Sequence, residues 1–276
     1  EPVKDVQMTK GSLTTGKTIA DNDQIIVERI KKEDGIILGK TSCPEFGHSG
    51  SNESKIKDHC RNPWNLEFTS GGSSGGAAAS VAVGVNTVAQ GSDGGGSVRI
   101  PSAWNKLIGL KTSIGRISLK GVSPLAISYD TVGPLTRSIK DASLIFSILT
   151  NSPYLDFERI KHNKINILVV RGMPWMDIDD KIEKACEEAF VSLSKAGINI
   201  VDKEVYEIEE MHKLLAEHNG GTTIAEAYLE WKNLVDKFGS IMDKDVHNRM
   251  LKGKDMPKSS LDSIYNAEEI LSKSLH

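Results

Sequence analysis

Hydrophobic positions recur along the chain with two different spacings, and these spacings predict alternating helices and strands. Residues 21–33 place isoleucines on one helical face, and Asp21 or Asp23 can cap the first turn. Residues 35–39 form a short apolar run between glycines, which indicates a strand. The same criteria predict further strands at 107–110, 165–170 and 198–205, and further helices at 77–88, 139–149 and 177–196.

The order of these elements predicts the fold class. Residues 165–205 read as a buried strand, an amphipathic helix closed by Gly197, and a second strand, which is a β-α-β unit with parallel strands. Beyond residue 207 the pattern is that of polar helices. We therefore expect an α/β fold with a mixed central sheet flanked by helices. We expect one domain over 1–276, with a core at 1–150 and the β-α-β unit and helical C-terminal part at 151–276.

Two glycine- and serine-rich segments, 70–76 and 91–97, enclose the apolar stretch 77–88. Across residues 68–98 the only charged side chain is Asp93, whereas a flexible surface linker would carry more lysine and glutamate. This pattern predicts a loop, a buried helix and a second loop, with the two loops close together in space.

Composition and charge exclude several classes of protein. The 276 residues are 38% hydrophobic and 26% charged, with a formal net charge of −3, so neither a disordered chain nor a basic nucleic-acid-binding surface is expected. No apolar run reaches the roughly 20 residues of a membrane-spanning helix. The three cysteines form no C-x-x-C pair, which argues against zinc and against a disulfide framework. We expect a soluble cytoplasmic protein.

One segment matches a nucleotide-binding pattern. Residues Gly11 to Thr18 read G-x-x-x-x-G-K-T, the letters of a P-loop in which Lys17 would contact phosphates. A P-loop follows a buried apolar strand, but residues 4–10 are too polar for one. Nucleotide binding is therefore retained only as an alternative from a different functional class.

The glycine-rich loops also suggest nucleophilic chemistry. Ser97 ends a run of three glycines, where converging backbone N–H groups could stabilise an oxyanion. Ser73 and Ser74, in the other loop, offer hydroxyls that could relay a proton to a lysine. None of the seven histidines lies between His59 and His162 to serve as a nearby base.

Several motifs occur in the order found in the amidase signature family, which this sequence resembles densely over residues 5–150 and loosely beyond. The motifs are Gly35-Ile-Ile-Leu-Gly-Lys-Thr41, Pro44-Glu-Phe-Gly47, Arg61-Asn-Pro-Trp-Asn65, Gly71-Gly-Ser-Ser-Gly-Gly76, Gly91-Ser-Asp-Gly-Gly-Gly-Ser-Val-Arg-Ile-Pro101, Gly109-Leu-Lys-Thr112, Gly115-Arg116 and Asp130-Thr-Val-Gly-Pro-Leu-Thr-Arg137. The resemblance implies a Ser–Ser–Lys hydrolase that acts on carboxylic amides without metal or cofactor.

The resemblance also implies roles for individual residues. Ser97 corresponds to the nucleophile that forms the acyl-enzyme, and Ser73 to the bridging serine, which the family holds on a cis peptide. The oxyanion hole would consist of backbone N–H groups of Gly94, Gly95, Gly96 and Ser97. Asp93, Arg99 and Ser74 would orient the loops. By their position in the chain, Phe46, Gly47 and Ser49 are candidates for substrate contact.

The family's catalytic lysine has no match at the spacing that we expect. Lys4-Asp5 has the letters of the family pair but lies only seven residues before Gly11, closer than we expect. We therefore expect the lysine upstream of Glu1, and the chain to be an internal piece of a longer family member with little activity by itself. Within the chain, Lys40 is the best substitute for this base because it adjoins an apolar run, although we expect it to orient other groups or to lie at the surface. Lys4 is a further candidate for the base.

The expected activity is hydrolysis of a small-molecule amide to an acid and ammonia or an amine. The alternative within the family is the glutaminase subunit of a tRNA-dependent amidotransferase. A non-catalytic protein that keeps the pocket is a third reading. An uncovered sheet edge predicts self-association, and a homodimer is one form that it could take. Neither nucleic acid nor a membrane is expected as a partner.

Overall fold

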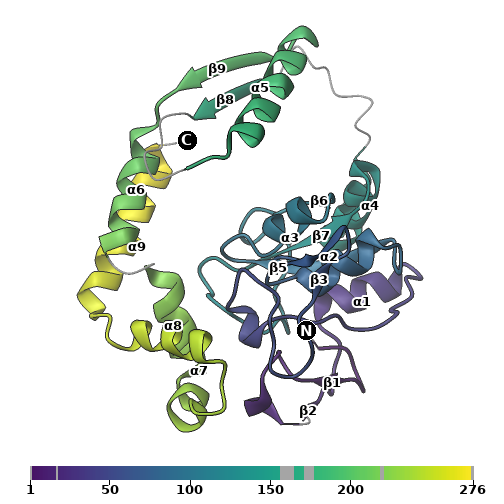
Figure 1. Cartoon of the computed structure of the whole chain (residues 1–276), viewed down its shortest axis with the longest axis vertical. Helices are drawn as coiled ribbons and strands as arrows, with labels where there is room; N and C mark the ends of the chain where they lie inside the picture. The colour runs from purple at the N-terminus through teal and green to yellow at the C-terminus, as the bar shows by residue number, and fades with distance from the viewer. Residues whose placement is uncertain (1, 17, 156–164, 171–176, 218–220, 275–276) are drawn as a thin grey trace. The chain divides into compact units, whose positions relative to one another are not determined.

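The computed structural model describes residues 2–16, 18–155, 165–170, 177–217 and 221–274 (Figure 1). The chain divides into two compact units. The first comprises Glu1–Leu155 and Gly220–Pro257, and the second Asp156–Asn219 and Lys258–His276. The expectation that they form one domain stays a prediction.

The first unit contains short strands, most of the helices described in the chain, and two single 3-10 turns at Leu13–Thr15 and Glu45–Gly47. Its strands are β1 (Gln7–Met8), β2 (Thr18–Ile19), β3 (Arg61–Asn62), β4 (Asn65–Thr69), β5 (Val88–Asp93), β6 (Ile108–Gly109) and β7 (Thr131–Thr136). Its helices are α1 (Ile25–Lys32), α2 (Gly75–Ala82), α3 (Arg99–Trp104), α4 (Ile139–Thr150), α7 (Thr222–Phe238) and α8 (Lys244–Lys254).

Strand β7 lies at the centre of this unit. It pairs antiparallel with β5 on one side and with β6 on the other, and all six of its residues are buried. Val132 packs in a cluster with Ile26 of α1 and Leu149 of α4, whereas Leu135 packs with Ala78 of α2. Because side chains alternate along a strand, β7 serves two separate apolar clusters, one on each face of the sheet.

Helix α2 packs closely because its residues are small. It reads Gly-Gly-Ala-Ala-Ala-Ser-Val-Ala, and Ala77, Ala78 and Val81 are almost fully buried. The predicted buried helix between the two glycine-rich loops is therefore confirmed. It ends at Ala82, earlier than the predicted residue 88, and Val83 and Val85 beyond its end are exposed.

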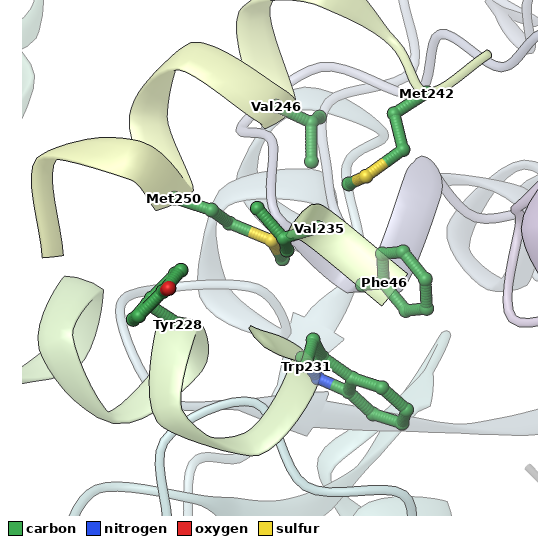
Figure 2. Packing of buried hydrophobic residues seen from close by; sticks show 7 residues of the cluster. All are labelled: Phe46, Tyr228, Trp231, Val235, Met242, Val246 and Met250. Atoms are coloured by element: carbon green, nitrogen blue, oxygen red, sulfur yellow. The ribbon is translucent and has the colours of Figure 1, made fainter. Parts of the chain in front are cut away.

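Helices α7 and α8 form a hairpin with its own apolar cluster (Figure 2). The cluster joins Phe46, far away in the sequence, to residues of the hairpin. Those residues are Tyr228, Trp231, Val235, Met242, Val246 and Met250.

The second unit confirms the predicted β-α-β unit. Its elements are β8 (Asn166–Val170), α5 (Asp180–Lys195), β9 (Asn199–Lys203), α6 (Tyr206–Glu217) and α9 (Lys258–Ser274). β8 and β9 pair in parallel, and Gly197 follows α5 with a φ of 86°. The strand is less buried than predicted, because Val169 is buried whereas Leu168 is half exposed. Parallel and antiparallel sheets with flanking helices confirm the α/β fold class, and the helices predicted after residue 207 are present.

The strand predicted at residues 35–39 is wrong. The segment is not assigned to a sheet, and the side chains of Ile36 and Leu38 are 84% and 66% exposed. A strand requires a neighbour whose backbone groups complete its hydrogen bonds, and an apolar run alone does not specify one.

The predicted cap of the helix after Asp21 is also wrong. The N-cap of α1 is Gln24, which makes no side-chain capping hydrogen bond. The Asp23 carboxylate instead accepts hydrogen bonds from the backbone N–H of Lys4 and from the Lys31 ammonium. Within the described part of the chain, none of the helices is long and apolar enough to cross a bilayer.

Candidate active site

The two glycine-rich loops meet, as the sequence predicts. The backbone N–H of Ser74, at the start of α2, donates to the carbonyl of Ser97 at 3.2 Å, and the Ser74 hydroxyl donates to the carbonyl of Ser92 at 3.4 Å. A Cβ on Gly91 would lie 2.5 Å from the Ser74 Oγ, so this approach requires glycine in β5.

A cleft of about 950 Å³ opens beside this junction. Ser73, Ser74, Gly94 and Ser97 all line it, so the structure brings the two predicted catalytic serines to one cavity. The Gly72–Ser73 peptide bond is cis, as the family resemblance implies.

Asp93 holds the loop that carries Ser97. Its carboxylate is buried and accepts hydrogen bonds from the backbone N–H groups of Gly96 at 2.7 Å and Val98 at 3.1 Å. The Arg99 guanidinium donates to both carboxylate oxygens, at 3.0 and 2.9 Å. Burial alone would raise the pKa of Asp93, but the hydrogen bonds from Arg99, Gly96 and Val98 hold the pKa below its ordinary value. Asp93 is therefore an ionised anchor for the loop.

This anchoring narrows the choice of oxyanion donors. Because the N–H of Gly96 donates to Asp93, it is already engaged within the loop. The backbone N–H groups of Gly94, Gly95 and Ser97 are the remaining members of the predicted set. Of these three residues, Gly94 and Ser97 line the cleft.

Of the three residues expected to contact substrate, two line the cleft. Phe46 and Gly47 line the cleft, and a Cβ on Gly47 would lie 3.3 Å from the Ser73 Oγ. Ser49 is not among the described residues that line it. Its hydroxyl bonds to that of Ser51 at 3.1 Å, and its carbonyl lies close to Gly72.

Sequence reasoning assigned no role to Glu45, which supports the turn that carries Phe46. The buried Glu45 carboxylate accepts a hydrogen bond from the Ser12 hydroxyl at 2.5 Å and another from the backbone N–H of Asp243 at 2.6 Å. Burial raises the pKa of Glu45 in spite of these hydrogen bonds. Its place in Pro44-Glu-Phe-Gly47 was the available signal.

Asp130 is a second carboxylate that sequence reasoning left without a role. It lines the cleft, accepts hydrogen bonds from the backbone N–H groups of Leu125 and Ala126, and would lie 3.1 Å from a Cβ on Gly94. Burial raises the pKa of Asp130 above its ordinary value. Its position at the start of the motif Asp130-Thr-Val-Gly-Pro-Leu-Thr-Arg137 was the available signal in the sequence.

Trp231 lines the cleft from α7, more than 130 residues beyond Ser97 in the chain, and nothing in its sequence context points to the site. Its ring stacks on that of Phe46, with centroids 4.8 Å apart, and its Nε1–H donates to the carbonyl of Pro124.

The in-chain lysines considered as bases occupy different positions. Lys40 lines the cleft, and its Nζ donates to the carbonyl of Gln7 at 3.0 Å. The Lys4 side chain is exposed. The residue before it, Val3, lines the cleft. Among the described residues, no group of three His, Cys, Asp or Glu side chains is arranged to hold a metal ion.

The segment with P-loop letters does not have P-loop architecture where it is described. Gly11 follows β1, a two-residue strand that pairs antiparallel with β2, and a 3-10 turn comes next in place of an α-helix. Lys17 lies outside the described residues.

Sequence comparison relates this chain to one family of proteins. The family model described as Amidase matches residues 2–265. The chain is 34% identical over 227 residues to a glutamyl-tRNA(Gln) amidotransferase subunit from Sulfurisphaera tokodaii, covering 78% of this chain and 47% of that one. It is 32% identical over 282 residues to the protein of the same name in Saccharolobus solfataricus, covering 91% and 59%.

A solved structure gives the same picture of the fold. A crystal structure of an amidase matches with a TM-score of 0.89 at 24% identity, over 99% of this chain and 61% of that chain. The chain thus spans about half the length of the curated relatives that it matches.

Proposed function

Because this chain belongs to the Amidase family, we propose that it hydrolyses a carboxylic amide through an acyl-enzyme on Ser97. The observation that carries the proposal is the cleft that Ser73 and Ser97 share, with the Ser97 loop held by the buried Asp93 carboxylate. A fixed loop with converging N–H groups is what a tetrahedral intermediate requires.

The proposed reaction uses these groups in turn. The Ser97 Oγ attacks the amide carbonyl, and its proton passes through the Ser73 hydroxyl to a neutral lysine. The N–H groups of Gly94, Gly95 and Ser97 stabilise the oxyanion. Return of the proton to the leaving nitrogen releases ammonia or an amine and leaves an ester on Ser97. Water attacks that ester, releases the carboxylic acid and restores the hydroxyl.

Lys4 is our first candidate for the lysine of this relay. The family match covers residues 2–265 and so includes the Lys4-Asp5 pair, which has the letters of the family's Lys-Asp pair. The adjacent Val3 lines the cleft. Lys40 is the second candidate because it also lines the cleft.

A fluorophosphonate reagent followed by intact-mass and peptide analysis tests the proposal. We expect one adduct, on Ser97, and none in Ser97→Ala. Ser73→Ala should label slowly, because the oxyanion donors remain. Lys4→Met should slow labelling far more than Lys40→Met. An adduct on any other residue would refute the role of Ser97, and equal effects of the two lysine variants would refute the role of Lys4.

A glutaminase activity within a larger assembly is the second candidate. The observation that favours it is that the relatives from Sulfurisphaera tokodaii and Saccharolobus solfataricus both carry the name of an amidotransferase subunit. Ammonia release from glutamine that depends on an added partner protein would favour this function. Hydrolysis of simple amides by the chain alone would favour the first.

A further inference from the structure

A lysine and two aromatic rings form one part of the cleft wall. The Lys10 Nζ lies 4.3 Å from the centroid of the Trp231 ring, and the Phe46 ring stacks on Trp231. All three residues line the cleft that contains Ser73 and Ser97. We call Lys10, Phe46 and Trp231 the Lys–Trp subsite.

The members of this subsite are held by separate contacts. The carbonyl of Lys10 accepts a hydrogen bond from the backbone N–H of Phe46 at 2.8 Å, so the lysine backbone is fixed to the turn before Gly47. Trp231 is buried, with 9% of its surface exposed, and its Nε1–H bonds to Pro124 at 3.1 Å. The subsite is thus positioned by three distant parts of the chain.

The turn that contacts Lys10 also lies beside Ser73. Gly47 directly follows Phe46, and a Cβ on Gly47 would lie 3.3 Å from the Ser73 Oγ. The backbone of Lys10 and the hydroxyl of Ser73 therefore flank the same short turn. A group bound at the subsite would therefore lie in the same cleft as the two serines.

The Lys10 ammonium is a positive charge in the wall of the cleft and would attract an anion. An ammonium packed against an aromatic face is partly withdrawn from water, which strengthens its attraction to a negative group. The charged side chains among the described lining residues are Lys10, Lys40, Asp34 and Asp130. Of these, Asp130 directs its carboxylate to the backbone N–H groups of Leu125 and Ala126.

We propose that the Lys–Trp subsite binds a carboxylate on the substrate, so that the preferred substrates are amides that carry a second, ionised carboxyl group. The inference rests on the proposed amide hydrolysis and names its substrate class. Lys10 supplies the charge, Trp231 holds the ammonium in place, and the Trp231 and Phe46 rings pack against the hydrocarbon part of the substrate. Succinamate is the simplest probe, and succinamide is its neutral isostere.

The test compares the two probes. We expect kcat/KM for succinamate to exceed that for succinamide, and Lys10→Gln to lower this ratio about tenfold, the scale of one charged hydrogen bond. Lys10→Arg, which keeps the charge, should retain most of the ratio. Trp231→Leu should lower it by raising KM for succinamate, since the ammonium loses its support.

The chain offers a matched control outside the cleft. Lys106 lies over the ring of Trp64 at 5.0 Å, and neither residue is among those that line the cleft. Lys106→Gln should leave the succinamate-to-succinamide ratio unchanged. Thermal melting of each variant establishes that it is folded before the ratios are compared.

Binding to the Ser97→Ala protein separates this inference from the proposed function. Calorimetry should show that succinamate binds about tenfold more tightly than succinamide, and that Lys10→Gln in the same background removes the difference. A difference in binding without turnover of either amide would retain the subsite and refute the proposed hydrolysis. Turnover of both amides at equal rates, or a ratio unaffected by Lys10→Gln, would overturn the subsite.

Discussion

Single residues at the candidate site combine burial with charge, and Asp93 is the strongest example. Its side chain is fully buried, whereas that of its partner Arg99 is 54% exposed. A carboxylate is retained in such a place only when hydrogen bonds replace the lost hydration. The three backbone N–H groups of Gly96, Val98 and Arg99, together with the guanidinium, provide that replacement.

We predict that Asp93→Asn lowers the free energy of unfolding by about 2–4 kcal/mol, since charged hydrogen bonds are lost inside the protein. Because the pKa of Asp93 is lowered on folding, its contribution is present above about pH 4 and is lost as the pH falls through the folded-state pKa. Urea unfolding between pH 3 and pH 7 measures both effects. Asp58→Asn, at an exposed carboxylate, is the control, and equal changes in the two variants would contradict the prediction.

His48 gives a second prediction at this scale. It is buried, its Nε2 has no hydrogen-bond partner among the described residues, and burial lowers its pKa to about 4. Between about pH 6.5 and pH 4 the His48 side chain is protonated in the unfolded state but not in the folded state. The free energy of unfolding therefore falls by roughly 3 kcal/mol as the pH is lowered from 6.5 to 4. His48→Gln should remove this slope.

Chemical denaturation at half-unit pH steps measures the slope that we assign to His48. His59→Gln serves as the control because His59 is exposed. A slope that persists in His48→Gln would show that another group titrates.

At the scale of elements, the α7–α8 hairpin is joined to the site by packing. Met250 of α8 is fully buried in the cluster that includes Phe46 and Trp231 (Figure 2). The Glu45 carboxylate adds a polar link, because it accepts a hydrogen bond from the backbone N–H of Asp243, the N-cap of α8. The hairpin therefore supports the aromatic wall of the cleft.

We predict that Met250→Ala lowers the free energy of unfolding by about 2–4 kcal/mol, through lost burial and the cavity that it leaves. Hydrogen exchange should increase in α7 and α8 and in the turn at Glu45–Gly47, and little in α4. Ile241→Ala, at a side chain that is 44% exposed, should change stability by less than about 1 kcal/mol. Faster exchange spread evenly over the first unit would contradict the proposed link.

At the scale of the whole molecule, apolar side chains remain exposed beside the cleft. Ile36, Leu38 and Val85 are each at least 66% exposed, and all three line the cleft. Exposed apolar groups gathered in one region mark a surface that binds other molecules or associates. Residues 35–39 thus form accessible apolar surface where the sequence predicted a strand.

We predict that the chain binds the dye ANS at this surface. The double variant Ile36→Ser/Leu38→Ser should lower the dye fluorescence at least about twofold and reduce self-association in light scattering. Ile114→Ser, at a residue that is 62% exposed and not among those lining the cleft, is the control. Equal loss of fluorescence in the control would show that the dye binds elsewhere.

The sequence by itself predicted the types of most elements and the meeting of the two loops that carry the candidate serines. The apolar stretch 77–88 indicated a buried helix, which the structure shows ending at Ala82. The two glycine-rich segments around it indicated loops that meet, which the hydrogen bond between Ser74 and Ser97 confirms. Gly197 ended α5 as predicted. These features depend on local spacing and on side-chain size, which are both properties of a short stretch of chain.

Only the tertiary structure decided which groups are engaged and which distant residues meet. The N–H of Gly96 is used by Asp93, residues 35–39 are not assigned to a sheet, and Lys10, Phe46 and Trp231 come together from three parts of the chain. Each outcome depends on a partner far away in the sequence or on the geometry of a closed turn. Hydrophobic periodicity records which way a side chain faces, but it does not record what that side chain contacts.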